Sequence, residues 1–523
     1  MRQILQIFRK DAIRHWPEIL ISLALLGIYA HWALHPKNPM AAVLSFTRIF
    51  LREEFIVPLL VFFWSFLAIR VVHGESLVGD RQWWVTKPYV WWKLLAAKVL
   101  FLLAFVGLPL FLVQLYLLRR AGFPTLPYVL AVLGMQVGLA TVLFLPSLAL
   151  GSLTRGLGQA LLGAVIAVLG VVAAAYLVAQ VPSAGMSSTA ETSEAAQGFL
   201  PVAAILVAAI WQYARRKTWY ARGLLFAAYA VVVLISVLTP YQKYVEKRYP
   251  IVNEREAPAH FSILRPQPDA PTYNLSSDLR SDVYLYFSLA VSDVAPRRMV
   301  RVDGVKATID LPDGYSWSPG WKSQWLTIWP EYDRQDLLYE LKRKDFEKFK
   351  TNTVRLRLEL ALAEYQPLDE RQMLLGHGKF RDAALGICQL DRLNRSAIEC
   401  VRPFLPPGVM AAFNPSDANC AIAENDQEIP DLNLSHAWLP PTDDSFDPGI
   451  DPVAEYSISF SSNTLRSYLP QDNSPRKRNV LSLCPGAAIS IAKPAERRKA
   501  RVKFEIDGVR LLDFTGSLQN LRL

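Results

Sequence analysis

The first 240 residues of this 523-residue chain contain no cysteine, and only 8 Asp and Glu against 19 Lys and Arg. All four cysteines lie in the remainder, where 37 Lys and Arg are balanced by 38 Asp and Glu. The basic character of the protein therefore belongs to its N-terminal part. Nucleic-acid binding would need a basic patch with base-stacking aromatics on a folded surface. The basic excess lies instead in the loops between apolar stretches, where it reports membrane topology, so we do not expect nucleic-acid binding.

Motifs of several enzyme classes are also missing. The chain has no Gly-x-x-x-x-Gly-Lys-Ser/Thr phosphate loop, and its nearest stretch, residues 376–379, is typical of a turn. It has no His-Glu-x-x-His, Cys-x-x-Cys or Gly-x-Ser-x-Gly motif. We therefore expect no catalytic, cofactor-binding or metal site here, and no enzyme activity of the chain's own.

Two groups of residues could hold a metal ion, but each has a simpler interpretation. His31 and His35 share one helix face, where interfacial residues are commonplace. Four aspartates could bind calcium by composition, but they lack the spacing of a known calcium loop. A solvated acidic turn is the simpler interpretation. The four aspartates are Asp443, Asp444, Asp447 and Asp451.

Seven apolar stretches fill the N-terminal part, each close to the roughly 20 residues that cross a bilayer core as a helix. They are Pro17–Leu34, Phe55–Val72, Leu94–Leu118, Pro127–Leu150, Gly156–Val181, Phe199–Ala214 and Ala221–Pro240. Seven in succession predict a polytopic α-helical membrane bundle of six or seven spans over residues 1–240.

Charge in the connecting loops predicts the orientation of the bundle. The N-terminus and the loops after the second, fourth and sixth stretches are basic, whereas residues 182–198 carry no Lys or Arg. The positive-inside rule then makes the N-terminus cytoplasmic, although the loops around residues 37–52 and 119–120 weakly oppose this. Seven crossings of the plasma (inner) membrane place the C-terminal part, from Tyr241 onward, in an extracytoplasmic position.

The loop at residues 74–98 interleaves four Trp and one Tyr with Lys and Arg. This composition is typical of a segment lying at the lipid headgroups. Pro88 breaks a helix within it. We therefore expect a helix–turn–helix elbow on the inner membrane surface.

The elbow resembles that of ABC transporter permeases of the type 2 exporter class. In that family a Glu closes the second span, followed by a Gly, a short apolar helix, a Pro, and a Lys ten residues later. The matching residues here are Glu75, Gly79, Trp83, Trp84, Pro88 and Lys98. The amphipathic residues 4–10 also resemble the family's interfacial helix, and the resemblance covers roughly residues 1–214.

The resemblance implies a membrane-spanning permease subunit of an ATP-driven transporter. ATP would bind a separate cytoplasmic ATPase subunit that docks on the elbow, and a second permease subunit would complete a homodimer or heterodimer. A simpler interpretation is that Glu75 caps or neutralises the elbow and that its aromatics anchor it. Glu18, Arg70 and Lys98 lie near span ends, where snorkelling explains them, so we expect no proton relay inside the bundle. The alternative function is a non-transporting, membrane-anchored sensory or binding protein.

Residues 241–523 predict a mainly-β, sandwich-like soluble domain that recognises substrate or a partner. Period-2 runs between turns predict the strands, and a helical insert is expected at Gln335–Lys350. A boundary near Pro367–Met373 gives a β-rich domain at residues 241–370, with residues 371–523 as a second β-rich domain or a continuation of the first. The predicted strands include Val283–Leu289, Ala307–Leu311, Val354–Leu362, Tyr456–Phe460 and Arg501–Ile506.

Cysteine and tryptophan add two further expectations. An even set of cysteines suits disulfides in an oxidising compartment, although the sequence leaves both the pairing and the alternative of buried thiols open. The cysteines are Cys388, Cys400, Cys420 and Cys484. Tryptophans recur every four residues from Trp317 to Trp329, and we favour core packing with an interfacial belt over a binding platform.

Overall fold

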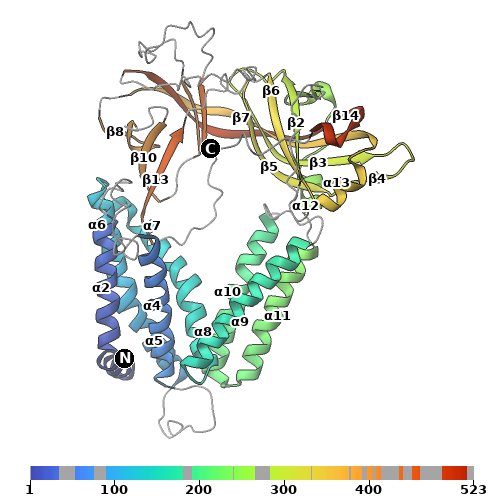
Figure 1. Ribbon diagram of the computed structural model, residues 1–523. Coiled ribbons are helices and arrows are strands. Elements are labelled where there is room, and N and C mark those ends of the chain that lie inside the picture. Colours follow the sequence, from blue (N-terminus) through green and yellow to red (C-terminus); the bar gives the residue numbers. More distant parts are fainter. Residues whose placement is uncertain are drawn as a thin grey trace, which may run out of the picture.

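The chain folds into a helical layer and a β-rich layer, as the computed structural model in Figure 1 shows. Helix α1 (Arg2–Arg14) lies at the end of the helical layer that is farthest from the strands (Figure 1). The structure describes residues 2–33, 53–75, 90–180, 191–238, 241–264, 283–330, 333–375, 378–390, 397–404, 408–413, 435–439, 450–459 and 486–514.

Six helices in the described part of the chain are long and apolar enough to cross a membrane. They occupy Phe55–His73, Trp91–Arg120, Leu126–Leu153, Leu157–Ala174, Gly198–Arg215 and Thr218–Ile235. A further apolar helix, α2 (Trp16–Trp32), is 17 residues long and packs against α4 (Glu53–His73). The predicted apolar helical bundle is therefore confirmed, and each predicted stretch overlaps one of these helices.

Two of the long helices contain a π-helical turn shortly before a proline. Pro109 and Pro146 are each the second residue after such a turn. A proline has no N–H and its ring crowds an earlier carbonyl, so the wider turn accommodates it without ending the helix. The segments are α5 (Trp91–Leu102), η3 (Leu103–Gly107) and α6 (Leu108–Arg120), and η4 (Leu126–Tyr128), α7 (Val129–Leu139), η5 (Ala140–Phe144) and α8 (Leu145–Leu153).

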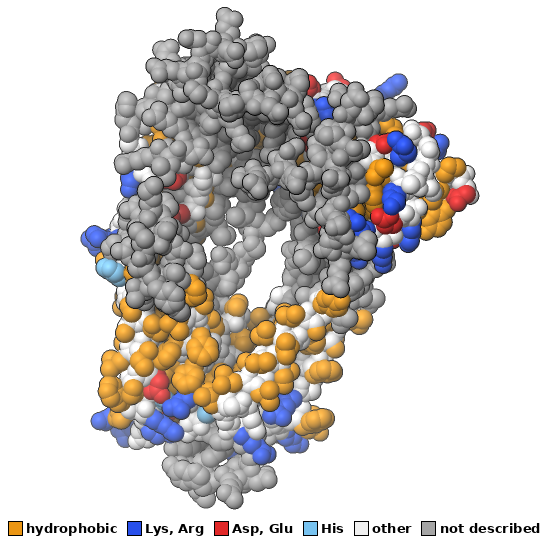
Figure 2. Space-filling view, viewed as in Figure 1, with side chains coloured by type: hydrophobic (Ala, Val, Ile, Leu, Met, Phe, Trp, Pro, Cys, Tyr) orange, Lys and Arg blue, Asp and Glu red, His pale blue; other side chains and the backbone are white. Residues whose placement is uncertain are grey.

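The bundle interior is formed mainly by α1, α2, α4, α5 and α6. Leu60 and Trp64 of α4 and Phe101 of α5 are fully buried, and the indole N–H of Trp64 donates to Ser22 Oγ at 2.9 Å. Apolar side chains also form an exposed band around the helices, with Lys and Arg below it (Figure 2). Such a band, bounded by positive charge, is the pattern expected of a surface that faces lipid.

Helices α9 (Leu157–Gln180), α10 (Glu191–Arg215) and α11 (Thr218–Leu238) form a second group. They are buried mainly near the end of the bundle where α10 meets α11, at residues such as Ala208, Tyr213 and Ala221. A hollow separates this group from the other helices closer to the β-rich layer (Figure 2).

Two antiparallel sheets pack face to face in the β-rich layer. One has the order β1-β2-β6 and the other β12-β11-β14-β7-β3-β4, with β5 also paired to β3. Phe287 and Leu337 from the first sheet meet Leu358 and Leu360 from the second in one buried core. The strands are β1 (His260–Ile263), β2 (Val283–Ser292), β3 (Met299–Asp310), β4 (Ser316–Trp317), β5 (Trp321–Ile328), β6 (Arg334–Leu341), β7 (Thr353–Leu374), β11 (Val409–Phe413), β12 (Ser435–Leu439) and β14 (Ala488–Arg510).

A third sheet of four antiparallel strands has the order β13-β10-β9-β8. It packs near the C-terminal end of β7 and the N-terminal end of β14. The long strands β7 and β14 pair with each other and supply residues to both β cores. Strand β7 continues through residues 367–373, where the sequence suggested a domain boundary. The strands of the third sheet are β8 (Phe380–Asp382), β9 (Gly386–Leu390), β10 (Ala397–Pro403) and β13 (Val453–Ser459).

The helix expected at Gln335–Lys350 is wrong over its first half. Residues Arg334–Leu341 form β6, in which Leu337, Tyr339 and Leu341 alternate toward the core while β2 pairs along its length. Only α13 (Arg343–Phe349) is helical there. The leucine spacing is compatible with both a helical period of 3.6 residues and a strand period of two. Pairing with β2 stabilises the strand.

Candidate functional site

A buried ion pair joins α1 to α5 at the end of the bundle opposite the strands. The Lys98 Nζ lies 2.7 Å from Asp11 Oδ2, and each side chain is only 1% exposed. Asp11 follows Ile7 on the buried face of the amphipathic helix α1. Because a buried charge is costly without a partner, this pair fixes α1 against the start of the third predicted span.

Glu75 extends this pair into a network. Its Oε2 lies 3.7 Å from Lys98 Nζ, and its Oε1 also pairs with Lys10 of α1. Glu75 follows the end of α4, and Lys98 lies within α5. The two ends of the predicted elbow and the N-terminal helix are therefore held together by one cluster, which we call the buried charge cluster: Lys10, Asp11, Glu75 and Lys98.

Further contacts surround the buried charge cluster. Arg14 donates to the Gly74 carbonyl at 3.2 Å, and Arg70 donates to Glu18 at 3.1 Å. Tyr213 of α10 is 2% exposed and belongs to the same buried core as Ile7 of α1 and Leu94 of α5. The core around the buried charge cluster therefore includes a residue from the second group of helices.

The interpretation of Lys98 as a snorkelling residue is wrong. A snorkelling lysine keeps its ammonium group in water, whereas this group is buried against two carboxylates. Glu18 and Arg70 form a pair that is partly exposed on the arginine side. The difference arises because α1 covers Lys98 and supplies Asp11.

His15 is buried between α1 and α2. Its Nδ1 lies 3.6 Å from Glu18 Oε1. Burial, which is only partly opposed by the neighbouring carboxylates Glu18 and Asp11, lowers the pKa of His15 below its ordinary value of 6.5. His15 is therefore held neutral beside the buried charge cluster.

Most of the elbow lies outside the described residues, including Gly79, Trp83, Trp84 and Pro88. Of the predicted coupling residues, the structure places Glu75 and Lys98 and brings them together. At the start of α5, Trp91 and Trp92 are exposed, and Lys93 lies over the Trp92 ring at 5.6 Å. These aromatics suit a position at the headgroups.

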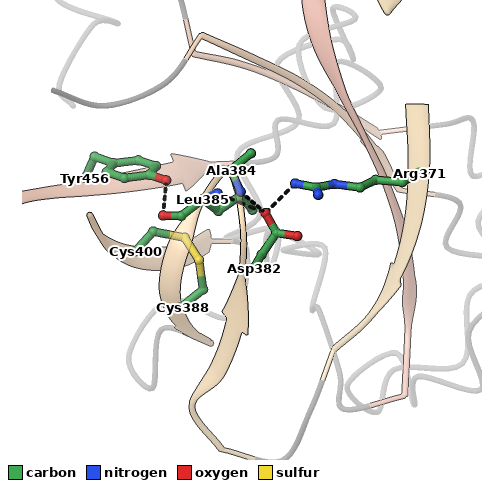
Figure 3. Close-up of a disulfide and its surroundings, with 7 residues drawn as sticks. All are labelled: Arg371, Asp382, Ala384, Leu385, Cys388, Cys400 and Tyr456. Carbon is green, nitrogen blue, oxygen red and sulfur yellow. Dashed lines mark hydrogen bonds and ion pairs between the residues drawn. A yellow bond between two sulfur atoms is a disulfide. The ribbon is translucent and has the colours of Figure 1, made fainter. Parts of the chain in front are cut away.

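A disulfide joins Cys388 of β9 to Cys400 of β10, directly across the strand pair (Figure 3). Asp382 accepts hydrogen bonds from the Ala384 and Leu385 N–H groups, and the Tyr456 hydroxyl donates to the Leu385 carbonyl at 2.6 Å (Figure 3). These bonds hold the turn between β8 and β9 against β13. Cys420 and Cys484 lie outside the described residues.

The same four-stranded sheet is docked on the helices. Gln136 donates to Gln114 at 2.7 Å, and Gln114 donates to the Ile450 carbonyl at 2.8 Å. The Ile450 side chain is 5% exposed and belongs to the core of the bundle. Arg381 of β8 also donates to the Gly122 carbonyl. The β-rich layer therefore contacts the bundle at Gln114 of α6 and at Gly122, which follows α6.

The remaining candidate groups show no ligand site among the described residues. No group of three or more His, Cys, Asp or Glu is placed to hold a metal ion in the described part of the chain. Trp321 and Trp329 are buried, as core packing requires. Asp451 accepts a hydrogen bond from Val453 N–H at 3.0 Å, while His35, Asp443, Asp444 and Asp447 lie outside the described residues.

Sequence reasoning missed Asp11, Gln114 and Gln136. One signal was available for Asp11, since an acidic residue on the apolar face of a helix needs a buried partner. Comparison with protein-family models and with curated proteins finds no match to this chain.

Proposed function

We propose that this chain is the membrane-spanning permease subunit of an ATP-driven ABC transporter. The observation that carries the proposal is the buried charge cluster, in which Glu75 and Lys98 meet at the two ends of the elbow. A docking element can transmit a displacement to the membrane helices only if its two ends are fixed to those helices. Here α4, α5 and α1 share that fixed point.

In this mechanism a separate cytoplasmic ATPase subunit binds ATP and presses on the elbow. The elbow passes the displacement to α4 and α5 through Glu75 and Lys98, and to α10 through the buried core that Tyr213 shares with these helices. A second permease subunit, identical or related, completes the transporter. Movement of α10 relative to the other helices would change the hollow between the two groups (Figure 2).

The β-rich layer acts outside the membrane in this proposal and recognises substrate or a partner. Support comes from the loop charges, from the Cys388–Cys400 disulfide, and from the placement of α1 away from the strands (Figure 1). Ile450 links this layer to α6. Movements of the bundle would therefore reach the recognition domain.

The test is purification of the chain with its associated proteins, followed by measurement of ATP hydrolysis. We expect an ATPase subunit to co-purify and Glu75→Gln to reduce hydrolysis by about tenfold, because Lys98 and Lys10 lose a shared charged partner. Glu347→Gln, in an exposed pair of α13, serves as the control and should leave hydrolysis unchanged.

The absence of an associated ATPase, or an unchanged rate in Glu75→Gln, contradicts the proposal. The first result favours the alternative, in which the bundle anchors a sensory or binding module without transport.

A further inference from the structure

A second charge cluster lies in the β-rich layer, far in sequence from the elbow. Glu364 of β7 is 1% exposed, and three arginines converge on its carboxylate. Arg298 Nη1 lies 2.7 Å from Oε1, Arg498 Nε lies 2.6 Å from Oε2, and Arg497 Nη1 lies 3.5 Å from Oε1. We call Arg298, Arg497, Arg498 and Glu364 the arginine cluster.

The arginine cluster carries an uncompensated positive charge. Three guanidinium groups share one carboxylate, and their side chains are 30%, 44% and 40% exposed. Like charges held this close repel one another. One arginine balances the charge of Glu364, so the two further arginines give this group of side chains a net charge of about +2 that an anion would neutralise.

The backbone is irregular at the points that bring these arginines together. The pairing of β14 with β7 shifts register between Glu496 and Arg498, which makes Arg497 the extra residue of a β-bulge. Adjacent strand residues normally point to opposite faces, and the bulge allows Arg497 and Arg498 to reach the same carboxylate. Next to Arg298, Arg297 adopts a positive φ of 60°.

The surrounding contacts fix the arginines further. Arg498 also donates from Nη1 to the Glu256 carbonyl at 2.7 Å, and Arg297 pairs with Glu370. A residue other than Gly at positive φ is unfavourable, and such residues gather where a ligand must be held. The fork of a guanidinium group matches the oxygens of phosphate, sulfate and carboxylate.

We propose that the arginine cluster is a binding site for an anionic oxyanion group, with phosphate as the representative ligand. Glu364 pre-orients the guanidinium groups, and Arg497, which has the longest contact with Glu364, directs its remaining donors to the ligand. The ligand is either a free oxyanion or the phosphomonoester headgroup of a lipid. The site goes beyond the transport proposal, and its test requires no ATPase.

The test is calorimetric titration of the purified full chain in detergent at constant ionic strength. The probes are inorganic phosphate and dihexanoyl phosphatidic acid, which is a soluble lipid with the same charged group. We expect saturable binding of one probe per chain. Binding of inorganic phosphate identifies a free oxyanion, whereas binding of the lipid alone identifies a headgroup.

Two variants separate the site from general charge. Arg497→Gln should weaken binding by about tenfold or more, because it removes a charge-assisted hydrogen-bond donor while Arg298 and Arg498 still pair with Glu364. Arg357→Gln removes a similarly exposed arginine that pairs with Asp310 and should leave binding unchanged. Absence of saturable binding of both probes, or equal weakening by the two variants, overturns the proposal.

Discussion

Single residues of the buried charge cluster should dominate the stability of the bundle. Lys98→Met leaves Asp11 without its closest partner, and we expect the free energy of unfolding to fall by about 3–5 kcal/mol. The double variant Asp11→Asn with Lys98→Met removes both charges and should recover a large part of that loss. Unfolding of the purified protein in denaturing detergent measures both effects.

The control for this pair is Lys503→Met, which removes an exposed partner of Glu359 and should cost at most about 1 kcal/mol. A Lys98→Met protein as stable as the unsubstituted chain would show that the pair is not buried as described.

His15 gives a pH dependence with a defined sign. Because burial lowers its pKa in the folded protein, the unfolded chain takes up a proton more readily than the folded one. The associated stability is present above pH 6.5 and is lost as pH falls through the lowered pKa. The unfolding temperature should fall between pH 7 and pH 5, and His15→Asn should reduce that fall. An equal fall in both proteins contradicts this role.

At this scale the sequence indicated part of the site. Glu75 and Lys98 were identifiable because their spacing resembles a family motif, and the structure places them 3.7 Å apart. Asp11 was not identifiable, because its partner Lys98 is 87 positions away and only the tertiary packing of α1 on α5 brings the two together. The arginine cluster was also missed, since a β-bulge cannot be recognised from alternation alone.

Among the elements, the disulfide between β9 and β10 should stabilise the four-stranded sheet. Replacing Cys388 and Cys400 by serine frees a short loop in the unfolded chain, and we expect a loss of about 2–4 kcal/mol. Thermal unfolding with and without a reducing agent measures the effect. The reducing agent should destabilise the unsubstituted chain more than the double variant, and an equal response would contradict this role.

Elements were predictable where their periodicity was unambiguous. The apolar helices and the strands at residues 283–292 and 453–459 follow directly from it. Pro367 suggested a domain boundary, but β7 continues through it. Pro367 lies opposite Pro494 of β14, so the two residues that lack an N–H group face each other. Pairing of β3 with β7 ends at Tyr365, and pairing of β11 with β14 ends at Ala492. Neither proline therefore interrupts a ladder with an outer neighbour.

For the whole molecule, the proposed function requires the strands and the buried charge cluster to lie on opposite sides of the bilayer. The buried charge cluster is at the end of the bundle that carries α1, and the strands are at the other end (Figure 1). Composition and loop charge could predict this division. They could not predict that Ile450 enters the bundle at Gln114, because the two residues are 336 positions apart.

Protease treatment of intact spheroplasts tests this arrangement most directly, using a chain with different epitope tags at its two ends. We expect the C-terminal tag to be lost while the cells are intact, and the N-terminal tag to remain on a membrane-embedded fragment until lysis. If the C-terminal tag survives until lysis, the strands lie inside the cell, and the proposed separation between ATPase coupling and external recognition is contradicted.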